Sequence, residues 1–172
     1  MNKINGLRFL PVMTASLLLA ACAQQPQPEP VAITPPVQEK PVAPPPALVI
    51  KDYHPAAPGK RGIVAAHINF INGTPNTLEY VMFKTTAFTD DGELVRSKKS
   101  GRKNAWLRVA GPFAPGESSG DKRWEQVWQN KDLSCFRIEG AELIDINGVV
   151  EYYDADRIAL QPQAAARGRC DG

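Results

Sequence analysis

Cysteine and histidine are among the side chains best suited to act as nucleophiles, bases or metal ligands, and this sequence has few of them. The 172 residues contain three cysteines and two histidines. His54 lies in a proline-rich stretch and His67 in an alternating apolar segment, and no serine or cysteine stands in the Gly-x-Ser-x-Gly context of a catalytic nucleophile. Metal ligands must cluster, whereas Cys135, Cys170 and the histidines are far apart along the chain. The sequence therefore predicts a non-enzyme without a metal site, with His67 a structural residue of a strand.

The third cysteine, Cys22, ends a leader that has the layout of an export signal. Lys3 and Arg8 supply positive charge, and residues 9–21 form an uncharged stretch rich in Leu and Ala that is too short to span a bilayer as a helix. With Leu-Ala-Ala-Cys at its end, residues 1–22 resemble a bacterial lipoprotein signal with its lipobox. The resemblance implies cleavage before Cys22 and acylation there, which gives a stable membrane anchor and no cofactor beyond this covalent lipid. The alternative is a buried helix that ends in cysteine.

The residue after Cys22 indicates whether the lipid anchor would lie in the inner or the outer membrane. Ala23 stands there, and not the Asp that signals retention in the inner membrane in lipoproteins of two-membrane bacteria. The resemblance therefore implies a lipid anchor in the outer membrane, with the rest of the chain facing the periplasm.

Cys135 and Cys170 remain as an even pair once Cys22 carries lipid. An exported protein enters an oxidising compartment, so a disulfide between them is permitted. Closing a loop of about 34 residues would stabilise the fold by roughly 3–4 kcal/mol. The sequence favours this bridge, and the alternative is two free thiols.

The net charge gives no reason to expect bulk attraction to nucleic acid. Without the leader the chain has 18 basic and 18 acidic residues, because Lys3 and Arg8 are lost. Two groups of side chains could still bind a partner, and the first is basic. Five cations nevertheless gather within eight residues: Arg96, Lys98, Lys99, Arg102 and Lys103. Anionic headgroups, lipopolysaccharide phosphates or an acidic protein surface would suit this run, and the alternative is a solvated loop.

The second group is aromatic and consists of Trp106, Trp124 and Trp128. Exposed tryptophan beside arginine makes a protein hot spot or a platform for stacking sugars. The alternative is that all three fill the core.

Residues 22–59 differ in composition from the rest and are predicted to form a disordered tether. Eleven of the sixteen prolines fall between residues 23 and 58. Proline removes backbone donors and fixes φ, so neither helix nor sheet can propagate there. Some 36 residues in polyproline II conformation would reach roughly 110 Å. A recognition role for the proline-rich run is the alternative to a plain tether.

Residues 60–161 have the patterns of one small β domain, followed by a loose tail over 162–172. Alternation and turn residues predict strands at 63–71, 78–89, 93–97, 105–109, 123–128, 136–146, 149–153 and 157–160. Asp91-Gly92 and Asn147-Gly148 are typical hairpin turns. A local helix over 124–130 is the one competing interpretation. About seven short strands without a long helix predict an all-β, antiparallel, immunoglobulin-like sandwich.

Two stretches also carry a resemblance to a family. The strand–turn–strand layout of residues 72–95, with Asp90-Asp91-Gly92 at its turn, is similar to the core of small immunoglobulin-like lipoprotein domains. Residues 111–117, which include Pro115-Gly116-Glu117, resemble the Pro-Gly-Glu corner of the same domains. FxLYD-type and YcfL-like envelope lipoproteins have this layout, and the resemblance implies an envelope setting but no catalytic residue.

These features together predict a non-enzymatic envelope lipoprotein whose sandwich binds another envelope component in a structural or assembly role. One alternative is a regulator of cell-wall synthesis, or a peptidoglycan-binding module, that acts through the tether. The remaining alternative is a hydrolase whose site forms only in three dimensions.

Overall fold

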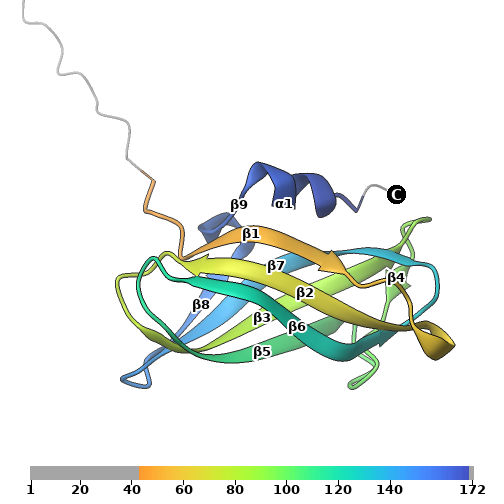
Figure 1. The fold of residues 1–172 in the computed structure, drawn as a ribbon, viewed down its shortest axis with the longest axis horizontal. Helices are drawn as coiled ribbons and strands as arrows, with labels where there is room; N and C mark the ends of the chain where they lie inside the picture. The colour runs from red at the N-terminus through yellow and green to blue at the C-terminus, as the bar shows by residue number, and fades with distance from the viewer. Residues whose placement is uncertain (1–42, 171–172) are drawn as a thin grey trace, which may run out of the picture. The chain divides into compact units, whose positions relative to one another are not determined.

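Two β-sheets lie face to face in the computed structural model, which describes residues 43–170 (Figure 1). The first sheet has the order β6 (Ser118–Gln129), β2 (Ile63–Asn72), β1 (Leu48–Pro55) and β9 (Ile158–Leu160). The second has the order β4 (Leu94–Val95), β3 (Leu78–Thr89), β7 (Leu133–Asp145) and β8 (Val150–Asp154), and β5 (Asn104–Phe113) also pairs with β3. All pairs are antiparallel except β1 with β9. The predicted all-β sandwich is confirmed, with nine strands in the described part where about seven were expected.

Aromatic side chains join the inner faces of the two sheets. Phe70 of β2 meets Phe83 of β3 and Phe113 of β5 edge to face, with ring centroids 5.3 and 5.0 Å apart. Trp128 of β6 packs on Phe136 of β7 at 5.1 Å. Such pairs add about 0.5–1.5 kcal/mol each beyond the burial of apolar area, and they hold the sheets in one arrangement.

Strand β1 corrects the predicted boundary between tether and domain. It lies inside residues 22–59, which were predicted to be disordered, and pairs with β2 on one side and β9 on the other. Leu48, Ile50 and Tyr53 are buried in the core, and Pro55 stands at the last position of the strand, where a missing N–H costs little. The domain therefore includes Leu48–Pro55. The leader, Cys22 and the tether as far as residue 42 lie outside the described residues.

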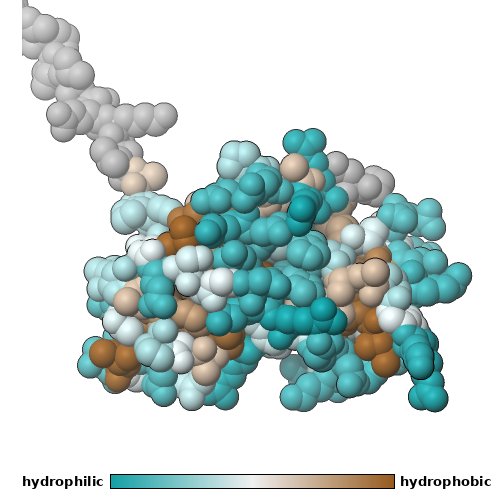
Figure 2. Space-filling model, in the orientation of Figure 1, coloured by the Kyte–Doolittle hydropathy of each residue, from teal (hydrophilic) through white to brown (hydrophobic). Residues whose placement is uncertain are grey.

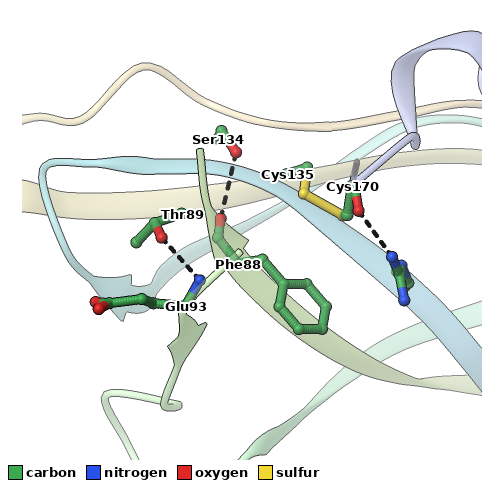
Figure 3. Close-up of a disulfide and its surroundings, with 7 residues drawn as sticks. Phe88, Thr89, Glu93, Ser134, Cys135 and Cys170 are labelled. Atoms are coloured by element: carbon green, nitrogen blue, oxygen red, sulfur yellow. Dashed lines mark hydrogen bonds between the residues drawn. A yellow bond between two sulfur atoms is a disulfide. The ribbon is translucent and has the colours of Figure 1, made fainter. Parts of the chain in front are cut away.

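The C-terminal segment also belongs to the domain, although residues 162–172 were predicted as a tail. Pro162–Arg167 forms the helix α1, whose Arg167 binds Asp52 of β1 at 2.8 Å. Cys170 forms the predicted disulfide with Cys135 of β7 (Figure 3), and the two Cα atoms are 5.6 Å apart. Between these contacts Gly168 lies so close to Tyr53 that a side chain there would overlap the tyrosine hydroxyl. The disulfide and the ion pair thus fasten α1 against β1 and β7.

The surface is mainly polar. Figure 2 shows one face on which hydrophobic residues form small separate spots and no continuous patch. The most exposed aliphatic side chains lie around the β7–β8 turn, where Ile146, Val149 and Val150 are 61%, 54% and 56% exposed. No helix among residues 43–170 is long and apolar enough to cross a membrane.

Candidate binding groove

A groove runs between two strand edges on one side of the sandwich. β6 is the terminal strand of the first sheet, and β5 pairs only with β3 in the second, so each has one side without a neighbouring strand in its sheet. The space beside them has a volume of about 610 Å³, within the range of ligand sites. Its walls are residues 105–108 of β5 and 124–127 of β6, with Ser97, Lys99 and Ser100 of the preceding loop. We call this space the β5–β6 groove.

The three tryptophans have different environments. Trp106 lines the groove and is 47% exposed. Trp124 also lines it, half-buried, and its indole N–H donates a 2.6 Å hydrogen bond to the Arg108 carbonyl across the groove. Trp128 is fully buried in the core. The core-filling interpretation was therefore right for Trp128 and in part for Trp124, which packs edge to face on the core residue Phe83 with ring centroids 6.2 Å apart. Trp106 is the exposed aromatic side chain of the groove.

The predicted basic run, Arg96–Lys103, forms the loop at one end of this groove. Lys98 is fixed there, because its N–H bonds to the Val127 carbonyl at 2.9 Å and its ammonium donates to Gln126 at 3.0 Å. Arg96 donates to the Gly101 carbonyl at 3.2 Å. Among residues 43–170, the exposed side chains of Lys99, Arg102 and Lys103 have no hydrogen bond or ion pair. Of these three, Lys99 lines the groove, so its ammonium is available to a ligand there.

A β-bulge shapes the opposite wall. Val64 and Ala66 are two residues apart on β2 but face Trp128 and Trp124, which are four residues apart on β6. The extra residues include Gln126, whose φ is +55°, a value that is costly for a residue with a side chain. Bulges re-aim side chains next to binding sites, and this one turns Gln126 out to the groove, where it accepts the Lys98 hydrogen bond.

Charge in the groove is predominantly positive. Arg108 lies on its β5 wall with the guanidinium 3.9 Å from the centre of the Tyr80 ring, a cation–π contact that fixes its position. Glu125 is the single acidic residue in the lining, and it is already bound to Arg123. An anionic ligand would therefore meet free cations and little repulsion.

The two histidines form a separate cluster on the first sheet. His54 of β1 and His67 of β2 are paired in register and stack with ring centroids 4.9 Å apart. His67 Nδ1 lies 2.9 Å from an Asp121 carboxylate oxygen, and its side chain is 13% exposed. His67 thus has the packed, hydrogen-bonded setting predicted for a structural strand residue. His54, which was placed in the tether, is instead part of β1.

Residues 43–170 contain no group of three His, Cys, Asp or Glu side chains arranged to hold a metal ion.

The groove brings together the basic run and two of the tryptophans, which the sequence analysis treated as separate groups. Arg96–Lys103 and Trp106 are close in the chain, but Trp124 comes from the other sheet, and Gln126 was not singled out at all. A signal for it existed: strict alternation over residues 123–128 would place Gln126 on the same inward face as Trp124 and Trp128. A glutamine there would be buried, and the bulge avoids this.

Comparison of the chain with protein-family models, with curated proteins and with solved structures gave no match in any of the three.

Proposed function

We propose that the protein is a non-enzymatic envelope lipoprotein, anchored in the outer membrane through Cys22, whose sandwich binds another envelope component at the β5–β6 groove. The observation that carries this proposal is the meeting of the exposed Trp106 ring and the partly buried Trp124 with the cations of Lys99 and Arg108 at one open side of the fold. Exposed aromatic rings and arginine are the side chains that contribute most to protein interfaces. The lipobox-like leader and the proline-rich stretch supply the anchor and the spacer.

The arrangement supports a role in local capture. Tethering a binding domain to a membrane raises its effective concentration near partners within reach of the linker. Because β1 belongs to the domain, 25 residues (23–47) separate Cys22 from the first strand. In polyproline II conformation they would span about 78 Å, which is shorter than the reach predicted from composition alone.

A cell-wall role is the second candidate, and Trp106 is the observation that favours it. An indole that is nearly half exposed can stack on a sugar ring, while Lys99 in the same groove could bind a carboxylate of the glycan or its peptide stems. Co-sedimentation with purified peptidoglycan sacculi tests this directly. A domain that sediments, and that stops doing so with Trp106→Ala, belongs to this second class.

In-cell crosslinking tests the leading proposal. A photo-reactive amino acid in place of Lys99, at the groove, is expected to trap a specific envelope protein in intact cells. The same residue in place of Asp156, in the η2 turn (Ala155–Arg157) beyond β8, is the matched control and is expected to trap nothing specific. Equal patterns at the two positions would refute the groove as the binding site.

The anchor is tested separately with Cys22→Ala. The lipidated chain is expected in the membrane fraction and the variant in the soluble periplasmic fraction. A variant that stays with the membrane would overturn the anchor and, with it, the proposed location.

A further inference from the structure

Strand β5 presents free main-chain groups to the groove. It pairs with β3 on one side only. Its Arg108 carbonyl accepts the hydrogen bond from Trp124, so this carbonyl points away from β3. In an antiparallel strand both main-chain groups of every second residue point the same way. The N–H and C=O of Trp106 and the N–H of Arg108 therefore also face the groove, where another strand could pair with them, whereas the Arg108 carbonyl is already bonded to Trp124.

The lining along β5 has the form expected of a strand edge. Four consecutive residues of β5 contribute to it, although side chains of consecutive residues point to opposite faces of a sheet. The groove is therefore bordered by the main chain of β5 along about 13 Å. An extended segment of four or five residues fits that length. On β6, by contrast, the Val127 carbonyl is already bonded to the Lys98 N–H.

Charge decides between possible occupants. Lys99 and Arg108 line the site, and its one acid, Glu125, is already paired with Arg123. A second copy of β5 would bring like charges together, which is unfavourable across a strand pair. Aspartate or glutamate on an incoming strand would instead meet the cations of Lys99 and Arg108. The exposed Trp106 ring offers an apolar surface to a neighbouring side chain of that strand.

We infer that the groove binds an extended acidic segment of a partner protein, which adds a strand to the free edge of β5. In this mode the main-chain hydrogen bonds supply affinity, and the cations with Trp106 select the sequence. The inference rests on the proposed function and specifies the kind of segment that the groove takes.

Selection from a random octapeptide display library, with the full-length chain in detergent micelles as bait, tests the inference. The enriched peptides are expected to be acidic, rich in β-branched residues and free of proline. The best of them is expected to bind at least tenfold more weakly to Lys99→Glu/Arg108→Glu, which reverses the two cations of the lining, and to Trp106→Ala. Lys60→Glu/Lys131→Glu is the control, because it makes the same charge change at exposed positions outside the groove lining. The affinity of this control variant for the selected peptide is expected to stay within twofold of the wild-type value.

Backbone methylation of the selected peptide tests strand pairing itself. Methyl groups on alternate amides remove every donor on one edge of a strand and leave the other edge intact. One of the two methylation patterns is expected to abolish binding and the other to preserve it. Equal binding of both, absence of enrichment, or enrichment of neutral or basic peptides would each overturn the inference.

Failure of the inference is distinguishable from failure of the proposed function. If soluble peptidoglycan fragments bind in a Trp106-dependent way and no peptide does, the acidic strand is wrong while the groove remains a binding site. If the crosslinker at position 99 traps nothing specific and neither class of probe binds, both proposals fail.

Discussion

At the scale of single residues, Asn72 is the polar side chain on which one end of the sandwich depends. It is fully buried at the end of β2. Its amide donates to the carbonyls of Asn76 at 2.7 Å and Phe113 at 3.0 Å, and its oxygen accepts from the Thr74 N–H at 2.9 Å. One side chain therefore ties the β2–β3 turn to the end of β5, the strand that forms one wall of the groove.

Asn72→Ala is expected to lower the free energy of unfolding by about 3 kcal/mol, because it leaves several buried partners without a hydrogen bond. Urea unfolding measures the change. Asn69→Ala in the same strand is the control, since its side chain makes one exposed hydrogen bond, to Ser118 at 3.2 Å. Its effect should stay within about 0.5 kcal/mol, and equal losses in the two variants would contradict the role of Asn72.

Asp145 gives a residue-scale prediction with a pH dependence. Its carboxylate accepts hydrogen bonds from the N–H groups of Val149 at 2.9 Å and Asn147 at 2.8 Å, and these bonds, above all that from Val149, hold its pKa below the ordinary value. A lowered folded-state pKa stabilises the fold above the unfolded-state pKa, and the stabilisation is lost as the pH falls through the folded value. Asp145→Asn is therefore expected to melt at a lower temperature than the wild type at pH 7.

That difference should shrink below about pH 4, where the aspartate of the unfolded chain is protonated. Thermal melts of both proteins between pH 7 and pH 3 measure it. A difference in melting temperature between the two proteins that is constant over this pH range would show that the charge of Asp145 does not stabilise the turn.

At the scale of elements, α1 is too short to be stable alone. A six-residue helix in water is unfavourable because nucleation costs more than so few hydrogen bonds return. What holds it are the Cys135–Cys170 disulfide, the Arg137 guanidinium bond to the Cys170 carbonyl at 2.7 Å, and the Arg167–Asp52 ion pair. The disulfide should contribute most, because it closes a loop between residues 35 positions apart.

Cys135→Ala/Cys170→Ala is expected to cost about 2–4 kcal/mol of stability and to increase hydrogen exchange in residues 162–168 before any change in β2. Arg167→Ala removes only a partly exposed ion pair and should cost less than about 1 kcal/mol. If α1 keeps its protection without the disulfide, the ion pair and packing are sufficient, and the assignment of its stability to the bridge is wrong.

Alternation predicted four strands closely, since it reports which face of a strand is buried. β2, β3, β8 and β9 begin and end within a residue of the expected ranges. β5 and β7 extend three or four residues beyond one predicted end, and β4 is only Leu94–Val95. β1 was missed because the surrounding prolines dominated the composition, although Leu48, Ile50 and Tyr53 supply its buried face. β6 was predicted too short, because residues 118–122 are polar and are held in the sheet mainly by main-chain pairing to β2.

At the scale of the whole molecule, the groove exists because two edges from different sheets end on the same side. Neither charge nor aromatic content along the chain reports which edges meet, so the basic run could be predicted and its pairing with Trp124 could not. The same is true of the bulge at Gln126, which depends on the register between β2 and β6. Lys99, Trp106 and Trp124 of the lining could be suggested from sequence, but their convergence with Arg108 and Gln126 required the fold.

Deletion of residues 25–42 tests what the spacer does for the whole protein. Seven residues would remain between Cys22 and β1 in place of 25. If the proposed tether is extended as polyproline II, its reach would fall from about 78 Å to about 22 Å. The domain and Cys22 are retained, so membrane fractionation and melting temperature should not change.

If the partner lies in the same membrane, crosslinking from position 99 should persist, because a shorter linker that still reaches raises the effective concentration. A chain in which residues 25–42 are rearranged at constant composition keeps the length and is the control. Loss of crosslinking in the deletion alone would mean that the partner lies beyond about 22 Å from the membrane, and would favour the cell-wall role over assembly at the membrane.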